Sequence, residues 1–226
     1  MPQPQLLIFD CDGVLIDSEV IAARVQCEML LEEGIEFDAS ELAARFAGLT
    51  WPAIVERLSD ETGQRFSSAF MARVDEEIDR RLGSEAEEIA GAHEMLDRLE
   101  MQRCICSNSS AARLELELEH VGLWDRFRPY VFSAADVGKP KPAPDVFLHA
   151  LKVFEVPAKA AIVIEDSVHG VAAAVAAGCR VVGFTGAGHS YPGHADALTE
   201  AGAETVISRL ADYPAIVEVF ASWQDI

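Results

Sequence analysis

The sequence predicts an α/β protein, with a doubly wound parallel sheet and an all-helical segment inserted near its start. Short apolar runs such as Leu6–Phe9 fit strands buried on both faces, because their apolar residues are consecutive and a polar turn follows. From residue 91 onward such runs alternate with helical patterns, which is typical of a parallel sheet. Residues 20–90 contain helical patterns and no strand candidate.

This change of pattern predicts two domains. Residues 1–17 and 91–226 are expected to form the α/β core, and residues 18–90 a helical domain inserted into it. The hinges between them are expected near Ser18 and across residues 83–91. A chain of 226 residues is long enough for one core and a smaller companion.

The order of the elements follows from apolar spacing and from start and stop signals. After the strand Leu6–Phe9, residues 20–33 show helical spacing and Gly34 is a C-terminal stop. Capping signals mark the starts of three further helices: Asp38 with Glu41, Thr50 with Pro52, and Ser68 before a run that ends near residue 82. The core is expected to resume with a helix over residues 92–99, strands at 104–106, 130–132, 161–164, 180–184 and 205–207, and helices near 110–121, 144–154, 168–177 and 196–201.

Composition and charge exclude several classes of partner. The formal net charge of −20 disfavours nucleic acid and anionic membranes, whose affinity for proteins comes largely from Lys and Arg. No apolar stretch approaches the roughly 20 residues of a membrane span, and the N-terminus lacks a basic signal peptide. The five cysteines lack metal-binding spacing and are interpreted as reduced core thiols, with Cys104 and Cys106 on opposite faces of their strand. We expect a cytoplasmic protein, monomeric or weakly homo-oligomeric.

Carboxylates follow two of the predicted strands directly. Asp10 and Asp12 come after the first strand, and Glu165 and Asp166 close the run over residues 161–164. In open α/β sheets ligands bind outside the carboxyl ends of the strands, so these side chains are positioned for chemistry. Their oxygens suit Mg²⁺. Solvated acidic turns have the same composition, and the spacing alone leaves that alternative open.

Four ordered segments resemble the motifs of the haloacid dehalogenase-like hydrolases. Within that family they are most similar to the motifs of the subgroup that includes β-phosphoglucomutase and small sugar-phosphate phosphatases. The resemblance runs from Leu6 to about residue 210 and implies a Rossmann-like core with a helical cap that closes over the substrate. It also implies Mg²⁺-dependent hydrolysis of small phosphorylated metabolites. The four segments are residues 10–19, 106–109, 141–145 and 164–167.

The resemblance implies a role for each motif. Asp10 is the expected nucleophile, forming an aspartyl-phosphate, and Asp12 the general acid and base. Ser107, Asn108 and Lys141 are expected to bind the substrate phosphate, although Ser107 taken alone is better explained as a plain helix cap. The expected metal ligands are Asp10, Asp12, Glu165 and Asp166.

Some assignments stay open at this point. Glu165 could act through water or a hydrogen bond instead of ligating the metal. Lys139-Pro140 imitates Lys141-Pro142, so Lys139 could share the role of Lys141. Trp51, at a helix start facing the expected active site, suits substrate contact and packing equally. The Gly-rich stretch that contains His189 and His194 is interpreted as a surface loop.

The leading interpretation is a phosphatase of sugar or sugar-acid phosphates, with 6-phosphogluconate among the candidate substrates. The alternative is a phosphosugar mutase resembling β-phosphoglucomutase. A mutase needs a second cationic site in its cap for the distal phosphate. Where that enzyme has a histidine and an arginine this chain has Ala22 and Trp51, and no lysine lies between Asp17 and Ala90. The phosphatase is therefore favoured.

Overall fold

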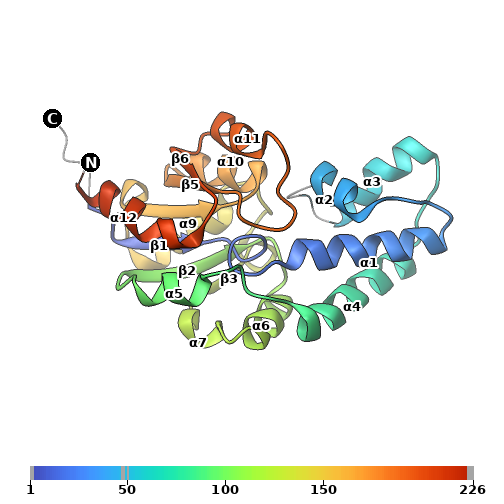
Figure 1. The fold of residues 1–226 in the computed structure, drawn as a ribbon, viewed down its shortest axis with the longest axis horizontal. Helices are drawn as coiled ribbons and strands as arrows, with labels where there is room; N and C mark the ends of the chain where they lie inside the picture. The colour runs from blue at the N-terminus through green and yellow to red at the C-terminus, as the bar shows by residue number, and fades with distance from the viewer. Residues whose placement is uncertain (1–2, 47–48, 50, 223–226) are drawn as a thin grey trace.

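The computed structural model describes residues 3–46, 49 and 51–222, and within them six parallel strands form one sheet (Figure 1). The strand order is β3-β2-β1-β4-β5-β6. The strands are β1 (Leu6–Phe9), β2 (Gln102–Ser107), β3 (Val131–Ser133), β4 (Ala161–Glu165), β5 (Arg180–Phe184) and β6 (Thr205–Ile207). The predicted doubly wound sheet is confirmed, and β1 lies at its centre with β2 and β4 as neighbours.

Helices cover both faces of the sheet, as the alternation along β1 requires. Leu6 and Ile8 join an apolar cluster with residues of α9 and α10, whereas Leu7 and Phe9 join a second cluster with residues of α5 and α12. The core helices are α5 (Ala92–Asp97), α6 (Ala111–His120), α7 (Trp124–Phe127), α8 (Ala134–Val137), α9 (Asp145–Phe154), α10 (Val168–Ala176), α11 (His194–Glu200) and α12 (Tyr213–Ser222), with short 3₁₀ turns at Ala158–Ala160 and Leu210–Asp212. The sequence had not predicted α7, α8 or α12.

Residues 18–90, called the helical insertion below, lie at one end of the sheet (Figure 1). Their helices are α1 (Ser18–Glu32), α2 (Ala39–Phe46), α3 (Trp51–Thr62) and α4 (Ser68–Glu85). The Asp38 carboxylate accepts a hydrogen bond from the Glu41 amide, as the capping signal predicts. The cap of α4 is Ser67, which accepts from the Phe70 amide, and the expected cap at Ser68 is wrong by one residue. The expected cap at Thr50 lies outside the described residues.

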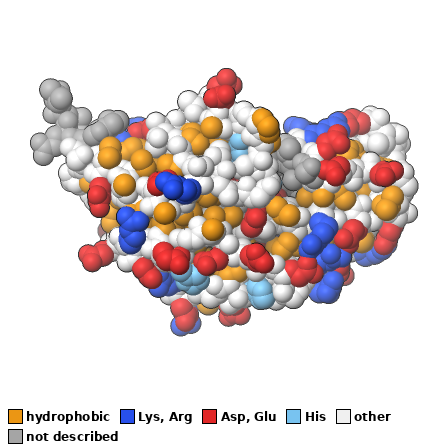
Figure 2. Space-filling model, in the orientation of Figure 1, with side chains coloured by type: hydrophobic (Ala, Val, Ile, Leu, Met, Phe, Trp, Pro, Cys, Tyr) orange, Lys and Arg blue, Asp and Glu red, His pale blue; other side chains and the backbone are white. Residues whose placement is uncertain are grey.

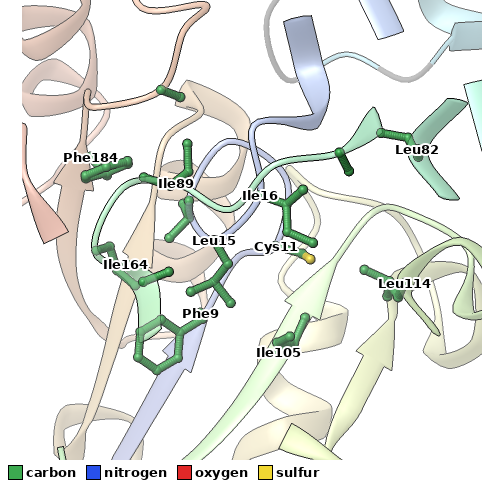
Figure 3. Close-up of a cluster of buried hydrophobic side chains, with 14 of the residues drawn as sticks. Phe9, Cys11, Leu15, Ile16, Leu82, Ile89, Ile105, Leu114, Ile164 and Phe184 are labelled. Carbon is green, nitrogen blue, oxygen red and sulfur yellow. The ribbon is translucent and has the colours of Figure 1, made fainter. Parts of the chain in front are cut away.

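Two linkers join the helical insertion to the core, and they hydrogen-bond to each other. The Asp17 amide donates to the Glu87 carbonyl at 3.0 Å, and the Ile89 amide to the Leu15 carbonyl at 2.8 Å. Leu15 and Ile89 are buried in an apolar cluster with side chains of β1, β2 and β4 (Figure 3). The second linker is shorter than expected, because residue 83 lies inside α4. The paired linkers hold the helical insertion over the carboxyl ends of the strands.

The rest of the molecule agrees with a charged, globular protein. No helix among the described residues has the length and apolar character needed to cross a membrane. On the face shown in Figure 2, acidic side chains lie over the core and the insertion, with basic side chains interspersed.

All five cysteines are free. Cys104 and Cys106 belong to the same apolar cluster, so the expectation of opposite faces is wrong, because residues two apart on a strand share a face.

Candidate active site

A buried lysine connects the ends of three strands. The Lys141 Nζ donates to Asp10 Oδ1 at 2.8 Å, to Glu165 Oε1 at 2.6 Å and to the Cys106 carbonyl at 2.8 Å. Burial disfavours the charged amine, but Asp10 and Glu165 outweigh it and raise the pKa of Lys141 above its ordinary value. Lys139 is exposed. Of the two lysines the sequence left open, Lys141 is therefore the one that contacts Asp10.

Asn108 fixes the backbone that carries this lysine. The Lys141 amide donates to Asn108 Oδ1 at 2.8 Å, and Asn108 Nδ2 donates to the Lys141 carbonyl at 3.4 Å. Asn108 follows the end of β2, so the clamp ties the segment before α9 to the sheet. The side chain of Asn108 thus positions Lys141, and its backbone amide remains the group predicted for phosphate.

Three hydroxyl groups orient Asp12. Ser18 donates to Asp12 Oδ1 at 2.6 Å, while Ser107 and Ser109 donate to Oδ2 at 3.1 and 2.8 Å. Ser107 is also the acceptor for the Ser109 amide at 2.9 Å. No role was predicted for Ser109, although its position two residues after Ser107 was a usable signal. The predicted phosphate ligand Ser107 is thus already hydrogen-bonded to the predicted acid and base.

Glu165 is held on both of its oxygens. Oε1 accepts from Lys141, and Oε2 accepts from the Ser167 amide at 2.9 Å and from its hydroxyl at 3.0 Å. Gly170 leaves room for the carboxylate, since a Cβ there would lie 1.7 Å from Oε1. Glu165 is fully buried and does not line the cavity described below. These contacts favour the indirect role, and direct metal ligation by Glu165 stays a prediction.

Asp166 contacts two histidines that follow β5, one in the loop and one at the start of α11. His189 Nε2 lies 3.0 Å from Asp166 Oδ2, and His194 Nε2 lies 2.7 Å from the Asp166 carbonyl. Both histidines are buried, so interpreting them as part of a surface loop is wrong. Burial alone would lower the pKa of His189, but the hydrogen bond and charge of Asp166 raise it to about 9. Sequence spacing gave no signal for these contacts, because they depend on how the loop folds back over β4.

The carboxylates at the ends of β1 and β4 are close enough to share a cation. Ligand oxygens of Asp10, Glu165 and Asp166 all lie within 4.8 Å of one another. Burial and the charge of Glu165 raise the pKa of Asp10, with Lys141 opposing them. A cluster of carboxylates with this much repulsion and oxygen donors alone fits a hard divalent cation.

A cavity of about 400 Å³ lies between the strand ends and the helical insertion. Its floor consists of the predicted site residues Asp10, Asp12, Ser107, Asn108, Lys141 and Asp166, and its opposite side includes Glu19, Gln26, Trp51, Asp75 and Asp79. Trp51 both lines the cavity and packs against Phe70, with ring centroids 6.4 Å apart. Both interpretations of Trp51 therefore keep support. The volume suits a small metabolite.

Known proteins share this arrangement of sequence and fold. The profile of the haloacid dehalogenase-like hydrolases matches residues 7–184. The chain is 32% identical to the 6-phosphogluconate phosphatase of Escherichia coli (strain K12), covering 85% of this chain and 87% of that protein. A structure of a conserved haloacid dehalogenase-like protein of unknown function from Agrobacterium tumefaciens str. C58 is 48% identical, with a TM-score of 0.90, and the match covers 97% of this chain and 100% of that one. A hydrolase structure from Deinococcus radiodurans R1, with bound phosphate and sodium, is 31% identical, with a TM-score of 0.80, covering 96% and 97%.

Proposed function

The chain belongs to the haloacid dehalogenase-like hydrolase family, and on that basis we propose that it is a Mg²⁺-dependent phosphatase of small phosphorylated metabolites, in particular sugar phosphates. The observation that carries the proposal is the contact between Asp10 and Lys141 at the floor of the cavity, where β1 and β4 end. The phosphatase named among the relatives and the phosphate in the related hydrolase structure support it.

In the proposed reaction Asp10 attacks the phosphorus of the ester. Lys141 holds Oδ1, which leaves Oδ2 for the new bond. As the phosphorus–oxygen bond to the alcohol breaks, Asp12 gives its proton to the departing oxygen. Asp12 then takes a proton from a water molecule that attacks the aspartyl-phosphate. This step releases free phosphate and restores the Asp10 carboxylate. The three hydroxyl contacts of Asp12 support this role, because they fix its orientation.

The phosphate group is proposed to lie against Lys141, the Ser107 hydroxyl and the Asn108 amide. To donate to a phosphate oxygen the Ser107 hydroxyl must turn from Asp12, and Ser109 keeps its own contact with that carboxylate meanwhile. Lys141 adds a positive charge close to both Asp10 and the substrate. The backbone amide of Asn108 stays available for the phosphate, because Asn108 holds Lys141 through its side-chain carboxamide.

Mg²⁺ fits the donor set at the ends of β1 and β4. We propose that the carboxylates of Asp10 and Asp166 and the backbone carbonyl of Asp12 hold it, with Glu165 acting directly or through Lys141 and Ser167. When bound, the ion would neutralise phosphate charge and so favour attack by an anionic group. His189 Nε2 lies 3.0 Å from Asp166 Oδ2, and we propose that this contact orients the carboxylate.

The helical insertion is proposed to act as a cap domain, with residues 1–17 and 91–226 as the catalytic core. Its position over the floor of the cavity supports this role, since a cap excludes bulk water from the reacting groups. Free cysteines agree with a reducing compartment, and we propose that the protein acts in the cytoplasm as a monomer or weak homo-oligomer.

A metabolite screen with a chelation arm tests the function. Released phosphate is measured for a panel of phosphate esters, including p-nitrophenyl phosphate, with Mg²⁺, after exhaustive chelation, and after Mg²⁺ is restored. We expect hydrolysis that chelation abolishes and Mg²⁺ recovers. Full activity without metal would contradict the metal site, and no phosphate from any ester would contradict the function.

A further inference from the structure

Opposite the floor, the cavity ends in a second group of polar residues. The helical insertion forms this end with Glu19 and Gln26 from α1 and Asp75 and Asp79 from α4, and Arg113 reaches it from α6 of the core. We call these five residues the far end of the cavity. A substrate whose phosphate lies on Lys141 extends its alcohol portion in this direction.

Carboxylates dominate the charge of the far end. Glu19, Asp75 and Asp79 face one guanidinium, and that guanidinium is already paired. Arg113 Nε lies 2.5 Å from Asp79 Oδ1, and its Nη2 lies 3.4 Å from Asp75 Oδ1. An anionic group entering this end meets unneutralised carboxylates, or it must displace Asp79 from Arg113.

The side chain of Glu19 lies in the same acidic part of the cavity. No hydrogen bond or ion pair joins its side chain to another described residue. Burial, followed by the charge of Asp12, raises the pKa of Glu19 to about 7. The protein's own carboxylate therefore retains a proton near neutral pH, and a second anion there faces the same penalties.

Unpartnered polar groups at this end indicate what a ligand must offer. Gln26 is 7% exposed, and its side chain makes no hydrogen bond within the described part of the chain. The indole N–H of nearby Trp51 is also buried without a partner among the described residues. Buried polar groups are normally satisfied, so a bound ligand is expected to complete them. An ionised carboxylate accepts hydrogen bonds only, whereas a hydroxyl group donates and accepts.

We propose that the far end is a hydroxyl-binding subsite that selects phosphate esters of uncharged, hydroxyl-rich alcohols over esters of sugar acids. The inference rests on the proposed phosphatase function and narrows its substrate class. Hydroxyl groups can donate to Glu19 and Asp79 and both donate to and accept from Gln26. A carboxylate or second phosphate satisfies none of the acceptors.

Two substrates that differ at one carbon test this selection. Sorbitol 6-phosphate carries a hydroxymethyl group where 6-phosphogluconate carries a carboxylate. We expect kcat/KM to be about 10- to 100-fold higher for sorbitol 6-phosphate, because the carboxylate of 6-phosphogluconate places one repelled charge in a partly solvated site. In Asp79→Asn this ratio should fall at least about threefold, because one repelling carboxylate is removed. Asp97→Asn is the matched control, since Asp97 pairs with Arg126 on the surface away from the cavity.

Binding separates this inference from the phosphatase proposal. The same two esters are titrated calorimetrically into Asp10→Asn, where no hydrolysis is needed. Tighter binding of sorbitol 6-phosphate supports the subsite even if the wild-type protein releases no phosphate from any ester, a result that would reject only the proposed function. Equal or better turnover and binding of 6-phosphogluconate, or a ratio that Asp79→Asn leaves unchanged, would overturn the subsite.

Discussion

Replacing Gly170 with alanine tests whether the packing around Glu165 supports the site. The added Cβ would lie 1.7 Å from Glu165 Oε1 and 1.9 Å from its Cδ. Ordinary contact begins near 3.4 Å, so the carboxylate must shift by about 1.7 Å. It has no free space, because Glu165 is fully buried and bonded to Lys141 and Ser167. The shift breaks the 2.6 Å contact with Lys141.

Two opposing effects set the magnitude. Alanine favours the helix over glycine by about 1 kcal/mol. Disrupting a buried ion pair costs about 3–5 kcal/mol. We therefore expect Gly170→Ala to lower the free energy of unfolding by about 2–4 kcal/mol and, because Lys141 loses a carboxylate partner, to reduce p-nitrophenyl phosphate hydrolysis by about 10- to 100-fold.

Urea unfolding and phosphate release measure both effects on the same samples. Gly83→Ala is the matched control, a glycine-to-alanine change inside α4 whose Cβ meets only the flexible Leu116 side chain at 3.1 Å. We expect its stability to stay within about 1 kcal/mol of the parent. A Gly170→Ala protein as stable and as active as Gly83→Ala would refute the argument that Glu165 positions Lys141.

Three further predictions address the chemistry. Asp10→Asn should lose at least about a thousandfold in activity with the fold intact, and single-turnover solvent ¹⁸O should label Asp10 in the parent; label in phosphate alone would exclude the covalent step. β-Glucose 1-phosphate, with or without a bisphosphate primer, should yield free phosphate or nothing, and glucose 6-phosphate formed faster than phosphate would assign the chain to the mutases. In metal-free protein the His189–Asp166 contact should contribute about 2 kcal/mol below pH 6.5, lost as pH rises through about 9, because folding raises the pKa of His189. The difference in urea stability between the parent and His189→Gln should therefore vanish at high pH; a pH-independent difference would contradict the assignment.

Local patterns predicted the strands, and the resemblance to the family predicted the residues of the floor. β1 and β5 have the bounds predicted for them, and Asp10 and Asp166 each follow a strand directly. These features depend on residues close in the chain, so the sequence carries them directly. The resemblance to the family assigned the phosphate-binding role to Lys141, and this lysine contacts Asp10.

Contacts between distant elements were not predictable in the same way. The pairing of Arg113 with Asp79 depends on how α4 packs against α6, and no local pattern specifies that packing. The burial of His189 depends on the path of the loop after β5. In both cases the sequence shows ordinary surface residues, and only the tertiary arrangement brings Arg113 and Asp79 to the cavity and His189 to Asp166.

The pairing of the two linkers has a consequence for how such enzymes can be altered. Asp17 and Glu87 are backbone neighbours, so the helical insertion starts and finishes at a single point on the core. A different set of helices, grafted between these two residues, would cover the same core residues with a different cavity lining. The residues proposed for bond cleavage lie mostly in the core, and those proposed for selecting the alcohol lie mostly in the helical insertion. Evolution or engineering can therefore change substrate selection without changing the catalytic residues.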